Sequence, residues 1–293
     1  MQLLGSDWRQ EGTTVSEVAR ALSRLRMERD VREGGAALRT SVMTHIAWVP
    51  VDWLEIAVQT LDGLAERHPS RTILLVPEPA ADDSRIDAEV ALRRFDVSGL
   101  SRDVATEVVL LRLRGERAFA PGSIVSPLLV SGLPVFLRWR GEPTFGSDEL
   151  DQLVSLADRM VVDSGEWTHV PRALSKLLPC VEHTAVSDLA WRRTEPARRV
   201  LARLWPGIGQ IEELRVRGPR PEAHLLAGWL RARLAREVVL TVDEAPVLEE
   251  VAVDGRAHPV AAREARSQSD ELSLELDVFG RDAVYEQALA SVR

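Results

Sequence analysis

Two arginines and a tryptophan stand together at the end of an apolar run. Arg138, Trp139 and Arg140 close a segment that starts at Pro134 and has the composition of a buried strand. In open α/β sheets, ligands usually bind at the carboxyl ends of parallel strands. Guanidinium groups at such a position can bind an anionic group, and Trp and Arg are typical anchors of protein interfaces. The alternative is that Trp139 caps the edge of the sheet and that both arginines are solvated.

Two further segments place charged and aromatic side chains at strand ends. Arg71 stands at the start of the apolar run 72–76, directly after a proline-containing helix stop. Asp163 ends the short apolar run that begins at Arg159, and Trp167 follows four residues later. These side chains are candidates for binding because of their position, not because they form a known catalytic set.

No motif of a common active site occurs in the sequence. There is neither G-x-G-x-x-G nor G-x-x-x-x-G-K-[ST], and neither H-E-x-x-H nor G-x-S-x-G. Ser164 lacks the preceding glycine of a nucleophile elbow and is interpreted as a turn or helix N-cap residue. Lys176, the single lysine, lies in a segment expected to be helical and not on a phosphate-binding loop. We therefore expect a protein that is not an enzyme, and we assign no catalytic residue.

The distribution of histidine and cysteine gives little support to a metal site. Cys180 and His183 have a C-x-x-H spacing, but structural zinc usually takes four ligands. Cys180 is interpreted as a small hydrophobic residue, and as the single cysteine it cannot form an intramolecular disulfide. The sequence predicts neither a metal nor a cofactor.

Composition narrows the class of protein further. The 293 residues include 37 basic and 45 acidic side chains, which gives a net charge of −8. A nucleic-acid-binding protein is usually basic, so the acidic balance argues against that class. No run reaches the ~20 apolar residues that a membrane-spanning helix needs. The start of the chain, 1–9, lacks the apolar core of a secretory signal, and we expect a cytoplasmic protein without membrane contact.

The order of apolar patterns predicts an α/β fold. Expected strands and helices alternate from about residue 40 to residue 163, which favours a mixed, largely parallel sheet flanked by helices. Before this segment, residues 1–13 are polar and are expected to lack regular structure. Thr14 and Glu17 then have the spacing of a capping box, which predicts the start of a helix. This helix either packs on its own domain or serves as an arm that docks on a partner.

A second, smaller α/β domain is expected at the C-terminal end. Asp254-Gly255 predicts a two-residue hairpin turn, because both positions of a type I′ turn need positive φ. The alternation of leucine with polar residues over 272–278 predicts a half-buried strand. The predicted division is an N-terminal helix or arm over 1–36, an α/β domain over 37–185, and a C-terminal α/β domain over 186–293.

Four segments in series resemble one known family. They read HPSRTILLVP from His68, LPVFLRWRGEPTF from Leu133, LADRMVVDSGEW from Leu156 and SDLAWRR from Ser187. In order and spacing they are similar to the OpcA family, described as glucose-6-phosphate dehydrogenase assembly proteins. The resemblance runs from about Arg39 to the low 200s and continues more faintly to the C-terminus.

The resemblance implies a non-catalytic, cytoplasmic partner protein. It would bind glucose-6-phosphate dehydrogenase, favour the active oligomer of that enzyme and raise its activity in the oxidative pentose phosphate pathway. The alternative, from another class, is a small-molecule enzyme or sensor that binds an anionic metabolite, such as a sugar phosphate or a nucleotide, at the carboxyl ends of the N-terminal strands.

The motif positions and their chemistry supply the candidate partner-binding residues. These are Arg71, Arg138, Trp139, Arg140, Asp163, Trp167 and Trp191. Three positions depart from the family pattern: Arg138 stands where members have Trp, Ala190 where they have Asn, and Ala197 where they have Trp.

Overall fold

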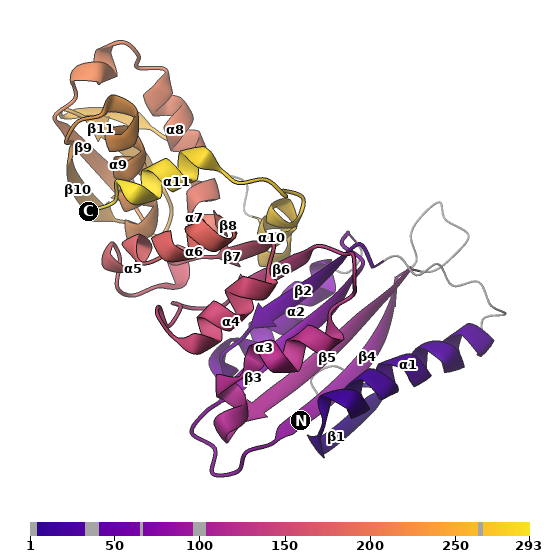
Figure 1. Ribbon diagram of the computed structural model, residues 1–293. Coiled ribbons are helices and arrows are strands. Elements are labelled where there is room, and N and C mark those ends of the chain that lie inside the picture. Colours follow the sequence, from indigo (N-terminus) through magenta and orange to yellow (C-terminus); the bar gives the residue numbers. More distant parts are fainter. Residues whose placement is uncertain (1–4, 33–40, 65–66, 96–103, 263–265) are drawn as a thin grey trace. The chain divides into compact units, whose positions relative to one another are not determined.

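The computed structural model describes residues 5–32, 41–64, 67–95, 104–262 and 266–293 (Figure 1). The chain divides into two compact units. The N-terminal unit consists of Met1–Met160 and Ser267–Phe279, and the C-terminal unit consists of Val161–Arg266 and Gly280–Arg293. The predicted boundary between residues 36 and 37 lies outside the described residues. Independent folding of 37–185 and 186–293 stays a prediction.

The N-terminal unit is built on a mixed sheet whose central strands are parallel. Its strands lie in the order β1-β4-β5-β3-β2-β6. Strands β5, β3, β2 and β6 are parallel to one another, while β4 is antiparallel to both β5 and β1. The strands are β1 (Trp8–Thr13), β2 (Met43–Trp48), β3 (Ser70–Glu78), β4 (Ile86–Phe95), β5 (Val104–Arg114) and β6 (Val135–Trp139). The predicted fold class, a mixed and largely parallel sheet flanked by helices, is confirmed.

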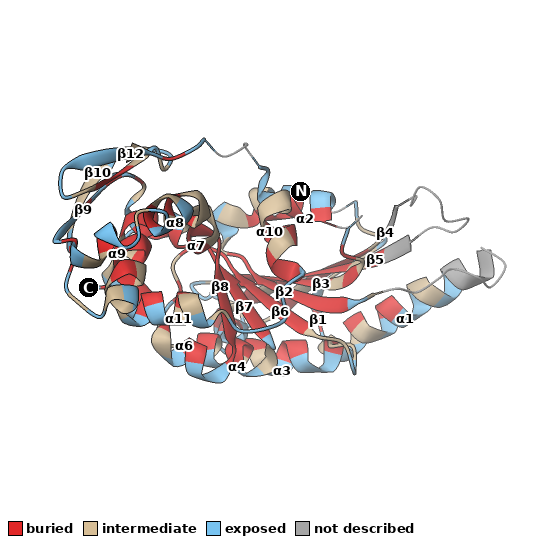
Figure 2. Ribbon diagram, turned by 90° about the horizontal axis from the view of Figure 1, so that it is seen from above, coloured by how far each residue is buried: buried red, intermediate tan, exposed pale blue. Residues whose placement is uncertain are grey.

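Helices cover both faces of this sheet. Helices α2 (Leu54–Leu64) and α10 (Gln268–Leu276) lie on one face, and α1 (Val15–Arg32), α3 (Pro121–Val125) and α4 (Asp148–Leu156) lie on the other (Figure 2). Every residue of β2 and of β6 is buried, as expected for strands that are covered on both sides.

The N-terminal segment confirms one prediction and corrects another. Glu17 Oε2 accepts a hydrogen bond from the Thr14 amide at 2.8 Å, and Thr14 Oγ1 accepts one from the Glu17 amide at 3.3 Å, so the capping box is present. Val18 and Leu22 are buried against the unit, which supports packing on the same domain rather than a free arm. The expectation that 1–13 lacks regular structure is wrong. Strand β1 forms there because its backbone pairs with β4, a long-range contact that local composition does not reveal.

The predicted strand over 272–278 is also wrong, because this segment forms helix α10. Ser267 and Asp270 make a capping box that starts the helix. Leu272 and Leu276, four residues apart, are both buried, which is the spacing of one helix face. The alternation of leucine with polar residues is compatible with a strand as well as with a helix. The capping box at Ser267 and Asp270 is the sequence feature that distinguishes the two.

The C-terminal unit contains a smaller sheet in the order β10-β9-β11-β12, in which β10 is parallel to β9 and the other pairs are antiparallel. Asp254 and Gly255 have φ values of 47° and 81°, which confirms the predicted hairpin between β11 and β12.

Strand β7 (Arg159–Val162) leads from the first unit into the second. The other elements are α5 (Arg172–Ser175), α6 (Leu178–His183), β8 (Ala185–Asp188), α7 (Leu189–Arg193), α8 (Glu195–Ala202), β9 (Glu213–Gly218), α9 (Arg220–Leu234), β10 (Val239–Glu244), β11 (Glu250–Val253), β12 (Arg256–Pro259) and α11 (Ala283–Ala290).

Close packing of α9 on α11 gives a test of this unit. A Cβ added at Gly228 would collide with the backbone carbonyl oxygen of Ala288, whereas one added at Gly280 would meet no heavy atom within 4 Å. We expect Gly228→Ala to lower the free energy of unfolding by about 1–3 kcal/mol through overpacking. Gly280→Ala, the matched control, should stay within about 0.5 kcal/mol of the wild type in the same urea titration. Equal stability of both variants would contradict the packing described.

Candidate functional site

Strand β6 sends the predicted arginines and tryptophan to opposite faces of the sheet. Arg138 pairs in register with Ala47, and Trp139 pairs with Trp48. Because successive side chains of a strand alternate, Arg138 and Arg140 share one face and Trp139 lies on the other. Trp139 stacks on Trp48 with ring centroids 4.9 Å apart.

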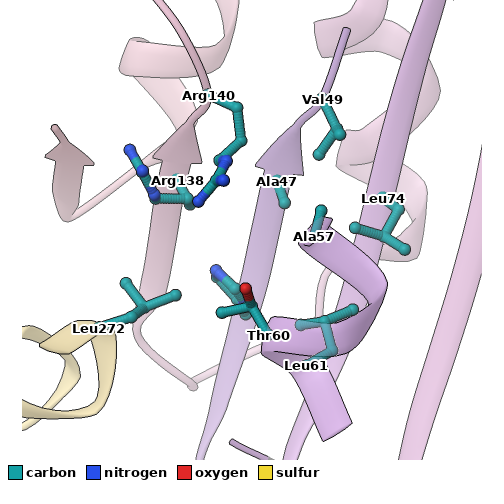
Figure 3. A pocket seen from close by; sticks show the side chains of 10 residues that line it. Ala47, Val49, Ala57, Thr60, Leu61, Leu74, Arg138, Arg140 and Leu272 are labelled. Carbon is teal, nitrogen blue, oxygen red and sulfur yellow. The ribbon is translucent and has the colours of Figure 1, made fainter. Parts of the chain in front are cut away.

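Arg138 and Arg140 line a cavity between the sheet and the two helices on that face (Figure 3). Its volume is about 20 Å³, which is room for one or two water molecules. A whole sugar phosphate or nucleotide does not fit inside it. Strands β2, β3 and β6, helix α2 and helix α10 contribute the walls, which are His45, Ala47, Val49, Ala57, Thr60, Leu61, Leu74, Arg138, Arg140 and Leu272.

Both guanidinium groups are buried. Arg138 and Arg140 are 2% and 4% exposed, so the alternative of solvated arginines is wrong. Arg138 Nη1 donates to the Trp139 carbonyl oxygen at 2.6 Å. Arg140 Nη1 and Nη2 both donate to Gln268 Oε1 at 3.1 Å, and the guanidinium lies 4.9 Å from the centroid of the Trp53 ring.

His45 also lines this cavity. Burial, together with the positive charges of Arg138 and His68, lowers the pKa of His45 to about 4. The imidazole is therefore neutral at pH 7. Its Nε2 atom is buried and has no hydrogen-bond partner within the described part of the chain.

Arg71 is part of a separate ion-pair cluster in the N-terminal unit. Arg71 Nε donates to Glu107 Oε2 at 2.7 Å, and Nη1 donates to the Leu128 carbonyl oxygen at 2.6 Å. Arg26 of α1 pairs with the same Glu107. Burial opposes ionisation of Glu107, but hydrogen bonds and charges of Arg26 and Arg71 lower its pKa below the ordinary value. The cluster thus ties α1 and β3 to β5.

Asp163 belongs to a buried cluster of the C-terminal unit. Its side chain accepts a hydrogen bond from the Gly165 amide at 3.0 Å and pairs with Arg193. Arg193 Nε also donates to Glu222 Oε1 at 3.1 Å. Ser164 begins a short 3₁₀ turn after β7, in agreement with its interpretation as a turn residue. Burial raises the pKa of Glu222 to about 7, although the neighbouring Arg193 opposes the shift.

Asp188 is the second carboxyl group of this cluster with a raised pKa. Its Oδ1 atom accepts hydrogen bonds from the Ser164 and Ala190 amides, both at 2.9 Å, and so caps α7. Burial first, and then the charge of Asp163, raise the pKa of Asp188 to about 6.

The two remaining candidates, both tryptophans, are also buried in the C-terminal unit. Trp167 and Trp191 are 7% and 5% exposed. The Trp191 indole donates to Asp282 Oδ2 at 2.9 Å, and the guanidinium of Arg198 lies 3.8 Å from the centroid of its ring. The structure thus brings Arg138 and Arg140 to one cavity, Arg71 to an ion-pair cluster, and Asp163 to a carboxylate cluster. Binding of a partner at these residues stays a prediction.

Sequence reasoning missed several residues at these sites. His45 and Thr60 share the cavity, and Gln268 reaches Arg140 from far along the chain. A strand alternation over 43–48 would have placed His45 on the face of Ala47, but no local signal relates either residue to Gln268.

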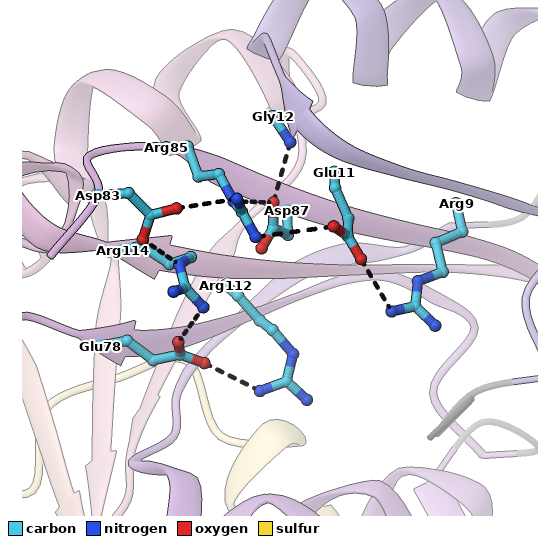
Figure 4. Close-up of polar contacts among 9 residues, drawn as sticks. All are labelled: Arg9, Glu11, Gly12, Glu78, Asp83, Arg85, Asp87, Arg112 and Arg114. Atoms are coloured by element: carbon cyan, nitrogen blue, oxygen red, sulfur yellow. Dashed lines mark hydrogen bonds and ion pairs between the residues drawn. The ribbon is translucent and has the colours of Figure 1, made fainter. Parts of the chain in front are cut away.

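Charged side chains also cover an open part of the N-terminal sheet, over β1, β3, β4 and β5 (Figure 4). Arg114 Nε donates to Asp83 Oδ1 at 2.7 Å, and this hydrogen bond lowers the pKa of Asp83. Exposed pairs of this kind contribute about 0–1 kcal/mol each. We interpret the network as a solvated sheet surface; its ionic members are Arg9, Glu11, Glu78, Asp83, Arg85, Asp87, Arg112 and Arg114.

The described residues contain neither a metal-binding cluster nor a membrane-spanning helix. No group of three or more His, Cys, Asp or Glu side chains in these ranges is arranged to hold a metal ion. No helix among the described segments has the length and apolar composition to cross a membrane. Cys180, the single cysteine of the chain, is buried in α6.

Comparison with known proteins finds similarity over part of the chain. A family model described as "Glucose-6-phosphate dehydrogenase subunit N-terminal domain" matches residues 62–178, which include β3 to β6 and the cavity arginines. Three curated relatives, from Synechocystis sp., Nostoc punctiforme and Synechococcus elongatus, are each named "Putative OxPP cycle protein OpcA". They are 25% identical over 184, 186 and 187 residues, or 59%, 59% and 60% of this chain. The matches cover 38%, 39% and 42% of the relatives, so the chain spans about two fifths of their length.

The chain is an α/β protein in which residues 62–178 match the model of a glucose-6-phosphate dehydrogenase subunit N-terminal domain. It is similar to the OpcA proteins, in agreement with the resemblance of the four serial segments.

The raised pKa of Asp188 makes stability depend on pH. A carboxyl group whose pKa is raised by folding stabilises the native state below its unfolded pKa, and this contribution is lost as pH rises through the native value. For Asp188 the window runs from about pH 4 to about pH 6. At about 1.4 kcal/mol per pKa unit, the loss is about 3 kcal/mol.

We therefore expect Asp188→Asn to gain stability relative to the wild type as pH rises from 4 to 7, because Asn keeps the capping oxygen without the buried charge. Urea titrations at pH 4, 5, 6 and 7 measure the difference. Asp82→Asn, at an exposed loop position, is the control and should show the wild-type dependence on pH. A constant difference between Asp188→Asn and the wild type over this range would show that Asp188 stays ionised.

Proposed function

We propose that this chain is a non-catalytic assembly protein and allosteric activator that binds glucose-6-phosphate dehydrogenase and promotes its active oligomer in the oxidative pentose phosphate pathway. The observation that carries the proposal is the match of 62–178 to a dehydrogenase subunit domain. The names of the curated relatives support a role in the same pathway. The cytoplasmic location, and the absence of nucleic-acid and membrane partners, belong to this proposal as predictions.

The physical basis of activation is a shift of population. A protein that binds the active assembly of an enzyme more tightly than its inactive form shifts the equilibrium by the ratio of the two affinities. A 100-fold ratio corresponds to about 2.7 kcal/mol, which converts an equal mixture almost wholly to the active form. No chemical step on this chain is required.

The burial of the predicted residues suggests how they would contribute to binding. Arg138, Trp139 and Arg140 are at most 4% exposed, so a docked enzyme would meet little of these side chains. Their contribution to the interface would be indirect: they hold β6 and the segment that follows it in place. The anionic-metabolite alternative keeps the same residues, but the cavity they line is too small for a sugar phosphate or a nucleotide.

The proposal is tested by mixing the full chain with its cognate dehydrogenase. We expect the two proteins to co-elute on a sizing column, with an increase in the mass of the dehydrogenase assembly and a higher kcat or a lower KM. The same amount of an unrelated acidic protein is the control. Separate elution together with unchanged kinetics, over a broad range of concentrations, would refute the proposal.

The Trp48–Trp139 stack gives a test of the indirect role. Trp139→Ala removes a buried ring and should lower the free energy of unfolding by about 3–5 kcal/mol, and it should weaken activation of the dehydrogenase. Trp139→Phe keeps an aromatic contact with Trp48 and should activate nearly as the wild type does. Trp205→Ala, which truncates a ring that is 68% exposed, is the control for stability. Full activation by Trp139→Ala would place the interface elsewhere.

A further inference from the structure

We propose that the cavity under α10 is a binding site for one small monovalent anion, of the size of a halide or formate. The inference concerns the N-terminal unit alone and does not depend on the proposed function. It rests on the charge of the walls, on a buried nitrogen without a hydrogen-bond partner, and on the volume.

The charge of the walls favours an anion. Three of the ten lining side chains carry basic nitrogen groups, namely Arg138, Arg140 and His45, and none of the ten is acidic. The three are 2%, 4% and 3% exposed. The positive charge of Arg138 acts on His45 strongly enough to help lower its pKa. Arg138 and Arg140 therefore place two guanidinium charges in the cavity wall, where a buried charge is only weakly screened by salt.

The hydrogen-bonding groups point to the same class of ligand. His45 Nε2 is buried, lines the cavity and has no partner among the described residues. Because this imidazole is neutral at pH 7, its Nε2 can carry the proton and donate a hydrogen bond to a ligand. Guanidinium groups form short, strong hydrogen bonds to anions, which offset the cost of taking a small anion out of water. In Figure 3 the nitrogen atoms of Arg138 and Arg140 lie between β6 and β2.

The volume sets the size of the ligand. About 20 Å³ accommodates one or two water-sized atoms, which matches a halide or the oxygen end of formate. The remaining walls are apolar: Leu61 and Ala57 of α2 and Leu272 of α10 contact the space from the side opposite the sheet. Sulfate and gluconate are too large for it.

Helix α10, from a distant part of the sequence, forms one wall of the site. Gln268 of α10 accepts both hydrogen bonds from Arg140, and Ser269 Oγ donates to the Thr60 carbonyl oxygen of α2 at 2.9 Å. His68 Nε2 and Ser273 Oγ are 2.7 Å apart. The anion would therefore bind to a pocket that is formed before binding, because α10 already contacts Arg140, α2 and His68.

Thermal unfolding and anomalous diffraction test the proposal. The full chain, prepared in sodium gluconate, is titrated with sodium bromide or sodium formate at constant ionic strength. We expect a saturable rise in Tm of a few degrees with each anion, since a ligand that binds only the native state stabilises it. Crystals soaked in bromide should show an anomalous peak within hydrogen-bond distance of Arg138, Arg140 or His45.

A matched pair of variants ties the effect to the cavity. Arg140→Met should abolish the rise in Tm, while Arg112→Met, which removes a partly exposed arginine of the same sheet, should keep it. If Arg140→Met does not fold, His45→Phe replaces it and should likewise lose the rise in Tm. The bromide peak in wild-type crystals then tests the site without a variant. Absence of an anion-specific rise, an equal rise in Arg140→Met, or a bromide-soaked crystal with only water in the cavity would each overturn the proposal.

Discussion

The alternation of side chains along β6 is the constraint on which the family segment depends. One strand, parallel to β2 and covered on both faces, sends two guanidinium groups to one side and an indole to the other. The indole stacks on Trp48. The guanidinium groups form hydrogen bonds beneath α2 and α10, because burying a charge without partners costs free energy. A change at Arg138 or Arg140 therefore acts on the face covered by α2 and α10, and a change at Trp139 acts on the opposite face.

This arrangement gives the motif residues a structural role. Arg71, Asp163 and Trp191 also bind neighbouring elements: Arg71 ties β3 to β5, Asp163 holds Arg193, and Trp191 bonds to Asp282 near the C-terminus. Side chains that join elements in this way define the shape of a surface. Under the proposed function, the shape and stability of that surface are what the sequence must preserve.

Much of the fold could be predicted from local patterns, and the failures have a common cause. The capping box at Thr14, the hairpin at Asp254-Gly255 and the buried run at 72–76 are local signals, and each is confirmed. Strand β1 was missed because its stability comes from pairing with β4, which is more than 70 residues away. Helix α10 was assigned as a strand because its leucines fit both periods, and its burial against α2 is a long-range contact. The candidate residues follow from motif position and side-chain chemistry, but their burial, and the roles of His45 and Gln268, depend on that same tertiary packing.

Under the proposed function, activation is a shift in the assembly of the dehydrogenase. The most direct measurement is the fold-activation by a saturating amount of this chain across a dilution series of the dehydrogenase, with the assembly mass recorded by sedimentation. We expect large activation at low dehydrogenase concentration, where the inactive form dominates, and little at high concentration, where the active oligomer already forms. Activation that is constant across the series, with no change in assembly mass, would contradict it.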